Sequence, residues 1–101
     1  MEITDQYPQG MASGTIETGA YKIIALGEVS DLNTRQSQKG TLALSTYGLE
    51  ATNVPTRGTG FCLTAINADD NRYGRQIAVS NVGIYSRMLN NGTFAAWVQI
   101  V

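Results

Sequence analysis

Short apolar runs, each bounded by glycine or by a cluster of polar residues, recur along this chain. They are rich in β-branched, leucine and aromatic residues, and several alternate between apolar and polar positions as half-buried strands do. The runs are also too short for typical helices, which need about ten residues or more. They are Ala20–Leu26, Thr41–Leu49, Gly60–Asn67, Gln76–Ser80, Ile84–Leu89 and Thr93–Val101. The sequence therefore predicts a mainly β domain: a small antiparallel sheet with long polar loops and a C-terminal β-hairpin.

The segments between these runs divide the chain into an arm and one folded domain. Residues 1–18 contain proline and glycine without a sustained hydrophobic period, so we interpret them as an N-terminal arm or linker. Residues 19–101 form the predicted β domain, whose own core is modest at this length. Residues 28–40 and 68–74 are polar loops, and a proline makes residues 51–60 a turn segment instead of a central strand.

The predicted C-terminal hairpin admits two registers, and the register decides which side chains share a face. A two-residue turn at Asn91-Gly92 pairs Leu89 with Phe94. A three-residue loop with Gly92 in the left-handed conformation pairs Leu89 with Thr93 instead. We favour the second register because it separates an apolar set of side chains from an aromatic and cationic one.

In the favoured register, Tyr85 pairs with Trp97 and lies on the same face as Arg87. There the guanidinium can lie over the indole in a cation–π contact of about 0.5–1 kcal/mol if exposed. The opposite face then carries the core set of Ile84, Met88, Phe94 and Val98. Two interpretations of Tyr85, Arg87 and Trp97 stay open: a structural cluster that fixes the hairpin, or an aromatic platform for a ligand.

Charge and composition argue against several kinds of partner. The net charge is −1, whereas nucleic-acid binding normally needs a basic face. No apolar run approaches the 18 or so residues of a membrane span, so we expect no membrane insertion. Charged residues make up 15% of the chain, against roughly 25% in an average domain. A surface rich in amides and hydroxyls is typical of extracellular and virion proteins.

The residue types also exclude most catalytic chemistry. The chain has no histidine, and Cys62 is its one cysteine, so neither a Ser–His or Cys–His pair nor a usual zinc site can form. Cys62 lies in an apolar run and is interpreted as a small buried hydrophobe. The adjacent carboxylates Asp69 and Asp70 lie in a polar loop, where solvated charges need no chemical role. We therefore expect no enzyme activity, no metal and no cofactor.

Several short motifs follow one another in a suggestive order. They are Gly19-Ala20-Tyr21, Asn53-Val54-Pro55, the strand Gly60–Ile66, Gln76-Ile77-Ala78, and the C-terminal spacing Tyr85-x-Arg87, Asn91-Gly92 and Trp97-x-x-Ile100. Over residues 19–101 this order resembles the pyocin-knob-type C-terminal domain of phage tail fibres, tailspikes and R-type pyocin fibres. The chain departs from that pattern in its long polar loop at Glu28–Gly40 and in Ala96, where the family often has proline.

The resemblance implies a virion protein that acts outside the cell as the receptor-binding tip of a tail fibre or tailspike. Its expected partners are a bacterial surface glycan (lipopolysaccharide or capsule), an upstream fibre segment and two further copies in a homotrimer. Three copies would add weak sites into useful avidity. The alternatives are a structural domain that trimerises or caps the fibre, and a non-catalytic domain of a polysaccharide-degrading tailspike.

Two loops have the residue types that commonly bind sugars, namely aromatic faces and planar polar groups. The first contains Asp69, Asp70, Asn71, Arg72 and Tyr73 and is the main candidate for receptor binding. The second, Arg35–Lys39, has the same mixture in part. For each loop the alternative is a solvated connection without a binding role.

Overall fold

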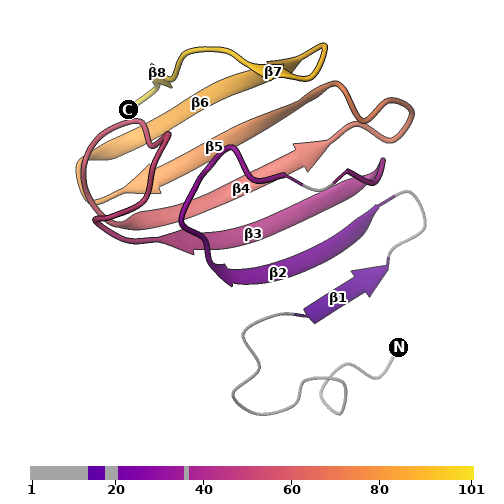
Figure 1. The fold of residues 1–101 in the computed structure, drawn as a ribbon, viewed down its shortest axis with the longest axis horizontal. Helices are drawn as coiled ribbons and strands as arrows, with labels where there is room; N and C mark the ends of the chain where they lie inside the picture. The colour runs from indigo at the N-terminus through magenta and orange to yellow at the C-terminus, as the bar shows by residue number, and fades with distance from the viewer. Residues whose placement is uncertain (1–13, 18–20, 36) are drawn as a thin grey trace.

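The computed structural model describes residues 14–17, 21–35 and 37–101, and these ranges contain β-strands and no helix. The elements are β1 (Gly14–Glu17), β2 (Lys22–Glu28), β3 (Thr41–Tyr47), β4 (Gly60–Ile66), β5 (Gly74–Ser80), β6 (Gly83–Asn90), β7 (Thr93–Phe94) and β8 (Val98–Gln99). They form one sheet in the order β1 to β7, and β8 also pairs with β6 (Figure 1). The predicted mainly β class is confirmed. Nothing in these ranges is a helix able to cross a membrane.

The sheet begins within the range that the sequence assigns to the arm. Strand β1 pairs antiparallel with β2, so that Gly14 lies opposite Ala25 and Glu17 opposite Lys22. The remainder of the predicted arm, together with Gly19-Ala20 of the opening motif, lies outside the described residues.

One pair of neighbouring strands departs from the antiparallel prediction. Strands β2 and β3 are parallel, with Ile23 opposite Leu42 and Ala25 opposite Leu44. Parallel neighbours cannot be joined by a tight hairpin, so the chain has to cross the sheet before it starts the next strand. The polar loop over residues 28–40 supplies this crossover. Its length is therefore a requirement of the topology, and we call residues 29–40 the crossover loop.

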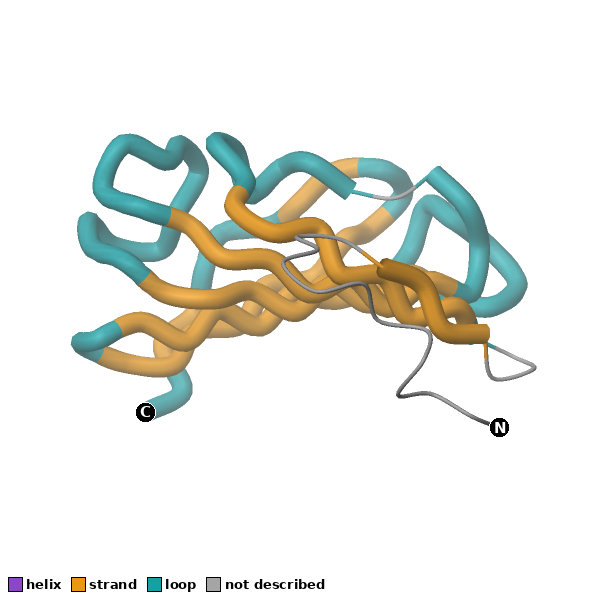
Figure 2. Tube along the Cα trace, turned by 90° about the horizontal axis from the view of Figure 1, so that it is seen from below, coloured by secondary structure: helices purple, strands orange, loops and turns teal. Residues whose placement is uncertain are grey.

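The sheet has one face that its own loops cover, here called the covered face. Ala43, Thr64, Gln76 and Arg87 lie in one row across β3 to β6 on this face. Most of the described loops lie on the same side of the sheet (Figure 2). The buried residues of β3 to β6 on this face are Thr41, Ala43, Tyr47, Cys62, Thr64, Ile66, Gln76, Ala78, Arg87 and Leu89. Cys62 is fully buried, as predicted for a small hydrophobe.

The centre of the core is a residue of the crossover loop. Leu32 is only 1% exposed and belongs to one cluster with Tyr47, Cys62 and Ala78. Val29, Ala51, Val54 and Trp97 pack around that cluster from the loops and the C-terminal segment. The core is therefore formed between a sheet and its loops, without a second sheet or a helix layer in the described ranges.

The opposite face, here called the open face, has most of the larger apolar residues of the central strands. By strand alternation they are Leu42, Leu44, Phe61, Leu63, Ile77, Val79, Ile84 and Met88. None of them is buried, and Leu44, Phe61 and Met88 are 43%, 52% and 45% exposed. Apart from Tyr47, Ile66 and Leu89, the central strands thus bury small and polar side chains under the loops and leave their larger apolar ones accessible.

The favoured register of the C-terminal hairpin is wrong. Leu89 pairs with Phe94 and Asn90 with Thr93, so the turn has two residues. Asn91 and Gly92 both have positive φ, 51° and 85°. Such a turn matches the right-handed twist of the flanking strands, which is why Asn-Gly is common at this position.

The change of register also corrects the two predicted faces. Phe94 lies over Arg87 on the covered face, whereas Met88 and Val98 of the predicted core set are exposed. Tyr85 pairs with Gln99, not with Trp97. In β7 the slip of one residue turns Phe94 to the covered face. Met88 and Val98 stay on the face that they share with Ile84, and they are exposed because the loops cover the other face.

Candidate functional site

Arg87 joins the sheet to the crossover loop from a buried position. Its Nε donates a hydrogen bond to Gln76 Oε1 at 2.7 Å. Its Nη2 donates to the main-chain oxygen of Leu32 at 3.0 Å and to Asn33 Oδ1 at 2.9 Å. Gln76 Nε2 donates to the same Leu32 oxygen at 2.6 Å, so two side chains of the sheet hold one carbonyl of the loop.

Two aromatic rings enclose the same guanidinium. Its central carbon lies 4.0 Å from the ring centroid of Phe94 and 4.4 Å from that of Trp97. The predicted contact between Arg87 and Trp97 is confirmed, although the arginine is buried and not exposed. Burial lowers the pKa of Arg87 from its usual value. An arginine side chain nevertheless stays charged in proteins, so the rings face a cation.

Trp97 connects this cluster to the loop that follows β3. Its Nε1 donates to the main-chain oxygen of Asn53 at 3.0 Å. Asn53 Nδ2 donates to Asp31 Oδ1 at 2.8 Å, and the main-chain N–H of Asn33 donates to the same oxygen at 2.8 Å. These two hydrogen bonds lower the pKa of Asp31, and the bond from Asn53 has the larger effect. The motifs around Asn53, Arg87 and Trp97 therefore meet in one anchor that holds two loops on the sheet, which favours the structural interpretation of the cluster.

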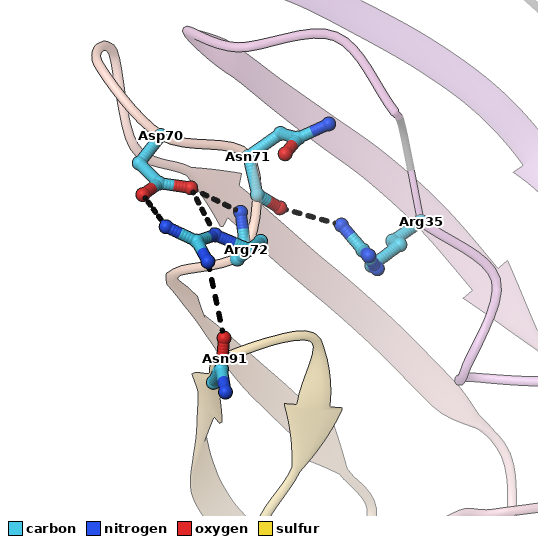
Figure 3. Close-up of polar contacts among 5 residues, drawn as sticks. All are labelled: Arg35, Asp70, Asn71, Arg72 and Asn91. Atoms are coloured by element: carbon cyan, nitrogen blue, oxygen red, sulfur yellow. Dashed lines mark hydrogen bonds and ion pairs between the residues drawn. The ribbon is translucent and has the colours of Figure 1, made fainter.

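A second polar cluster lies at one end of the sheet, where the two candidate sugar-binding loops come together (Figure 3). Arg35 Nη1 donates to the main-chain oxygen of Asn71 at 2.6 Å. Asn71 Nδ2 in turn donates to the main-chain oxygen of Ser37 at 2.7 Å. The far end of the crossover loop is thereby fixed against the loop between β4 and β5.

Within the loop between β4 and β5, Asp70 and Arg72 form a two-pronged ion pair. Arg72 Nη2 lies 2.8 Å from Asp70 Oδ2, and Nε lies 3.1 Å from Oδ1. The Arg72 amide also donates to Oδ1 at 3.0 Å. These bonds lower the pKa of Asp70 to about 2, and those from the Arg72 side chain have the largest effect. The Arg72 side chain remains 58% exposed, so part of its hydrogen-bonding capacity faces solvent.

Arg72 extends this cluster to the turn between β6 and β7. Its Nη1 donates to Asn91 Oδ1 at 3.4 Å, and the Gly92 amide donates to the Arg72 main-chain oxygen at 2.9 Å. The guanidinium carbon lies 5.6 Å from the ring centroid of Tyr73. The resulting loop-end surface, as we name it, consists of Arg35, Asp70, Asn71, Arg72, Tyr73 and Asn91.

The structure thus brings the two predicted loops together and adds one residue, Asn91, that the sequence predicts only as part of a turn. Asn91 joins the loop-end surface because β5 pairs with β6, with Gly74 opposite Leu89, so the segments before β5 and after β6 are neighbours. Asp69 is exposed at the loop surface, outside the bonded cluster described above. Among the described residues, no group of acidic, cysteine or histidine side chains is arranged to hold a metal ion.

Comparison with known proteins adds no relative to these observations, since no family model, curated protein or solved structure matches the sequence.

Proposed function

We propose that this chain is a receptor-binding domain of a bacteriophage tail fibre or tailspike, which binds a bacterial surface polysaccharide through the loop-end surface. The observation that carries this proposal is the meeting of planar polar groups and a tyrosine from separate loops in one cluster. Arg35, Asn71, Arg72, Tyr73 and Asn91 offer amide and guanidinium donors beside an aromatic ring. Sugar hydroxyls and the apolar faces of sugar rings fit groups of these types.

The way these loops are held also supports a binding role. Main-chain groups of Ser37, Asn71, Arg72 and Gly92 take part in the contacts that join the segments. A surface that is already ordered loses less conformational freedom when it binds, so more of the contact energy remains as affinity. A single site of this size binds a glycan weakly. In the homotrimer that we expect, three such sites would act on one repeated polysaccharide and raise the avidity.

The test is the binding of the purified domain to immobilised lipopolysaccharide and capsular polysaccharide from a panel of bacteria. On a polysaccharide that binds, Tyr73→Ala and Arg35→Ala should each weaken binding about tenfold, which corresponds to roughly 1.4 kcal/mol. Arg57→Ala is the matched control. Arg57 is an exposed arginine in the loop between β3 and β4, which lies at the end of these strands opposite to the loop-end surface. Equal binding by all variants, or no binding by the folded domain to any polysaccharide, would contradict the proposal.

A structural domain that assembles or caps the fibre is the second candidate, and the open apolar face favours it. Exposed side chains such as Leu44, Phe61 and Met88 are suited to packing against protein, not to binding a hydrated glycan. The two functions are separated by one comparison. A structural domain would form oligomers and bind no polysaccharide, whereas a receptor-binding domain would bind glycan through the loop-end surface.

A further inference from the structure

The distribution of side chains between the two faces of the sheet is unusual for a domain that stands alone. Under its own loops the sheet buries alanine, threonine, cysteine and glutamine positions, such as Ala43 and Gln76. Most of the larger apolar side chains of β3 to β6 point the other way, where Phe61 is 52% exposed, although Ile66 and Leu89 are buried under the loops. Domains are ordinarily built from packed layers that bury the more apolar face of each sheet. The described residues supply a layer for only one of the two faces.

The open face is somewhat smaller than one side of a stable protein interface. The strands β2 to β6 are each about seven residues long, which gives an area of roughly 24 by 23 Å, or about 550 Å² in projection, from the usual strand spacing and rise. The largest apolar patch on a typical monomer is about 300–600 Å², and a stable interface buries about 800 Å² on each partner. A contact that covers this face and part of its margin reaches the size of a stable interface.

The few charges on the open face and the hollows in it indicate that its partner is a second apolar face of this chain. On this face β2 to β6 have two charged residues: Glu28 at the end of β2, opposite Thr46, and Arg75, whose Nη1 donates to Ser86 Oγ at 3.1 Å. The face has a hollow of about 420 Å³ beside Leu44 and Phe61 and another of about 360 Å³ beside Met88. Exposed apolar side chains and hollows thus occur on the same surface, as self-association requires. The net charge of −1 gives little repulsion between copies.

We infer that the open face packs against a second copy of this chain. Two sheets that meet face to face about 10 Å apart form the core of a sandwich, and the outward leucines and Phe61 would then occupy that core. Phe61 and Met88 of each copy would enter the hollows of the other. The inference does not rest on the proposed receptor binding, because the loop-end surface lies beyond the end of β4 and outside the open face.

The first test compares the mass in solution of the unmodified chain with that of two matched variants. Leu44→Glu places a charge on the open face, and Leu49→Glu places the same charge at a 57% exposed leucine in the loop after β3. The unmodified chain and Leu49→Glu should have the mass of two copies of 10.9 kDa, or of three if the faces surround a common axis. Leu44→Glu should be a folded monomer by light scattering and far-UV circular dichroism. A monomeric unmodified chain, or an oligomeric Leu44→Glu, would overturn the inference.

A second measurement needs no variant and is decisive even if Leu44→Glu fails to fold. Met88 is 45% exposed on the open face, and dilute peroxide oxidises accessible methionines. Its oxidation, followed by mass spectrometry, should be at least several-fold slower at a protein concentration where copies associate than at one where they separate. An equal rate at both concentrations overturns the inference. Slow oxidation in a monomer also overturns it, because the cover would then come from the same chain.

Discussion

Replacement of Arg87 tests whether the buried guanidinium holds the loops on the sheet. The side chain is 6% exposed and donates to Gln76, Leu32 and Asn33. Arg87→Ala removes all three hydrogen bonds and both ring contacts. The Leu32 carbonyl keeps its bond from Gln76, and Asn33 is exposed and can bind water. The main loss at the acceptors therefore falls on Gln76 Oε1, which is buried.

The magnitude follows from these contacts. A buried acceptor left without its donor costs about 1–3 kcal/mol. The cation–π contacts with Phe94 and Trp97 are desolvated and contribute about 2 kcal/mol together. We expect Arg87→Ala to lower the free energy of unfolding by roughly 3–5 kcal/mol, a large part of the 5–15 kcal/mol of a typical domain. Arg87→Lys keeps the charge and loses the planar fork, so it should recover about half of that loss.

The assay is urea unfolding followed by far-UV circular dichroism, at a protein concentration low enough that association does not add to stability. Trp97 fluorescence, which comes from the one tryptophan of the chain, gives a second signal from the anchor itself. Arg57→Ala, at an exposed arginine, should stay within about 0.5 kcal/mol of the unmodified chain. A loss below about 1 kcal/mol for Arg87→Ala, with an unchanged urea dependence, would refute the anchoring role.

Four further tests, three by substitution and one by a chemical reaction, address other parts of the fold. The pKa of Asp70 in the folded protein is about 2, below the ordinary 3.8. The stabilisation of the fold by its ionised carboxylate is therefore complete above about pH 4 and is lost as the pH falls through about 2. Asp70→Asn should therefore flatten the pH dependence of the urea midpoint in that interval, and an identical pH dependence would contradict this. Tyr47→Phe should leave stability unchanged or raise it by about 1 kcal/mol in thermal unfolding, because the buried Tyr47 hydroxyl has no hydrogen-bond partner among the described residues. A clear loss of stability in that variant would show that the hydroxyl is satisfied after all. Gly60→Ala would press its Cβ against a main-chain oxygen of β5 and should lower the free energy of unfolding by about 1–3 kcal/mol. Gly48→Ala has room for its Cβ and should leave stability nearly unchanged. The expectation fails if the two alanine variants unfold at the same urea concentration. Cys62 is fully buried and burial raises its thiol pKa, so a thiol reagent should react with it at the rate of unfolding and much faster in urea. Rapid reaction in the native protein would refute its burial.

The strands could be predicted from the sequence because their signal is local. The run Gly60–Ile66, for example, is apolar and bounded by glycine and polar residues, and it forms β4 within those limits. Which face of the sheet is covered could not be read in the same way. The alternation in β3 separates Leu42 and Leu44 from Ala43 correctly, yet the smaller residue is the buried one. That choice depends on where the loops pack, which no single strand encodes.

The crossover loop is the element that a local analysis describes least well. Its residues are mostly polar, and the buried position of Leu32 depends on a carbonyl held by Gln76 and Arg87 from distant strands. The hairpin is a different case. The Asn91-Gly92 pair itself favours a two-residue turn, and this local signal predicts the observed register better than the grouping of apolar residues does.

At the candidate site, the loop over Asp69–Tyr73 could be identified from its residue types alone. Its neighbours could not, because Arg35 reaches it through the crossover and Asn91 through the pairing of β5 with β6. The chemistry of the cluster was thus visible in the sequence one loop at a time, and its extent only after the strands were placed side by side.

Gln76 and Arg87 hold the crossover loop on the sheet through a main-chain carbonyl, that of Leu32. Every residue type has this carbonyl, so these two hydrogen bonds set no requirement on the side chain at position 32, whereas Asp31 and Asn33 take part in the anchor through their side chains. The contacts of Ser37 and Asn71 with their neighbours likewise use main-chain oxygens as acceptors. Exposed residues of the crossover loop whose side chains make none of these contacts, such as Thr34, can therefore be exchanged while Arg35 keeps the loop in place. One scaffold of this kind can present loops that differ at such exposed positions, and it is a suitable host for substitutions there.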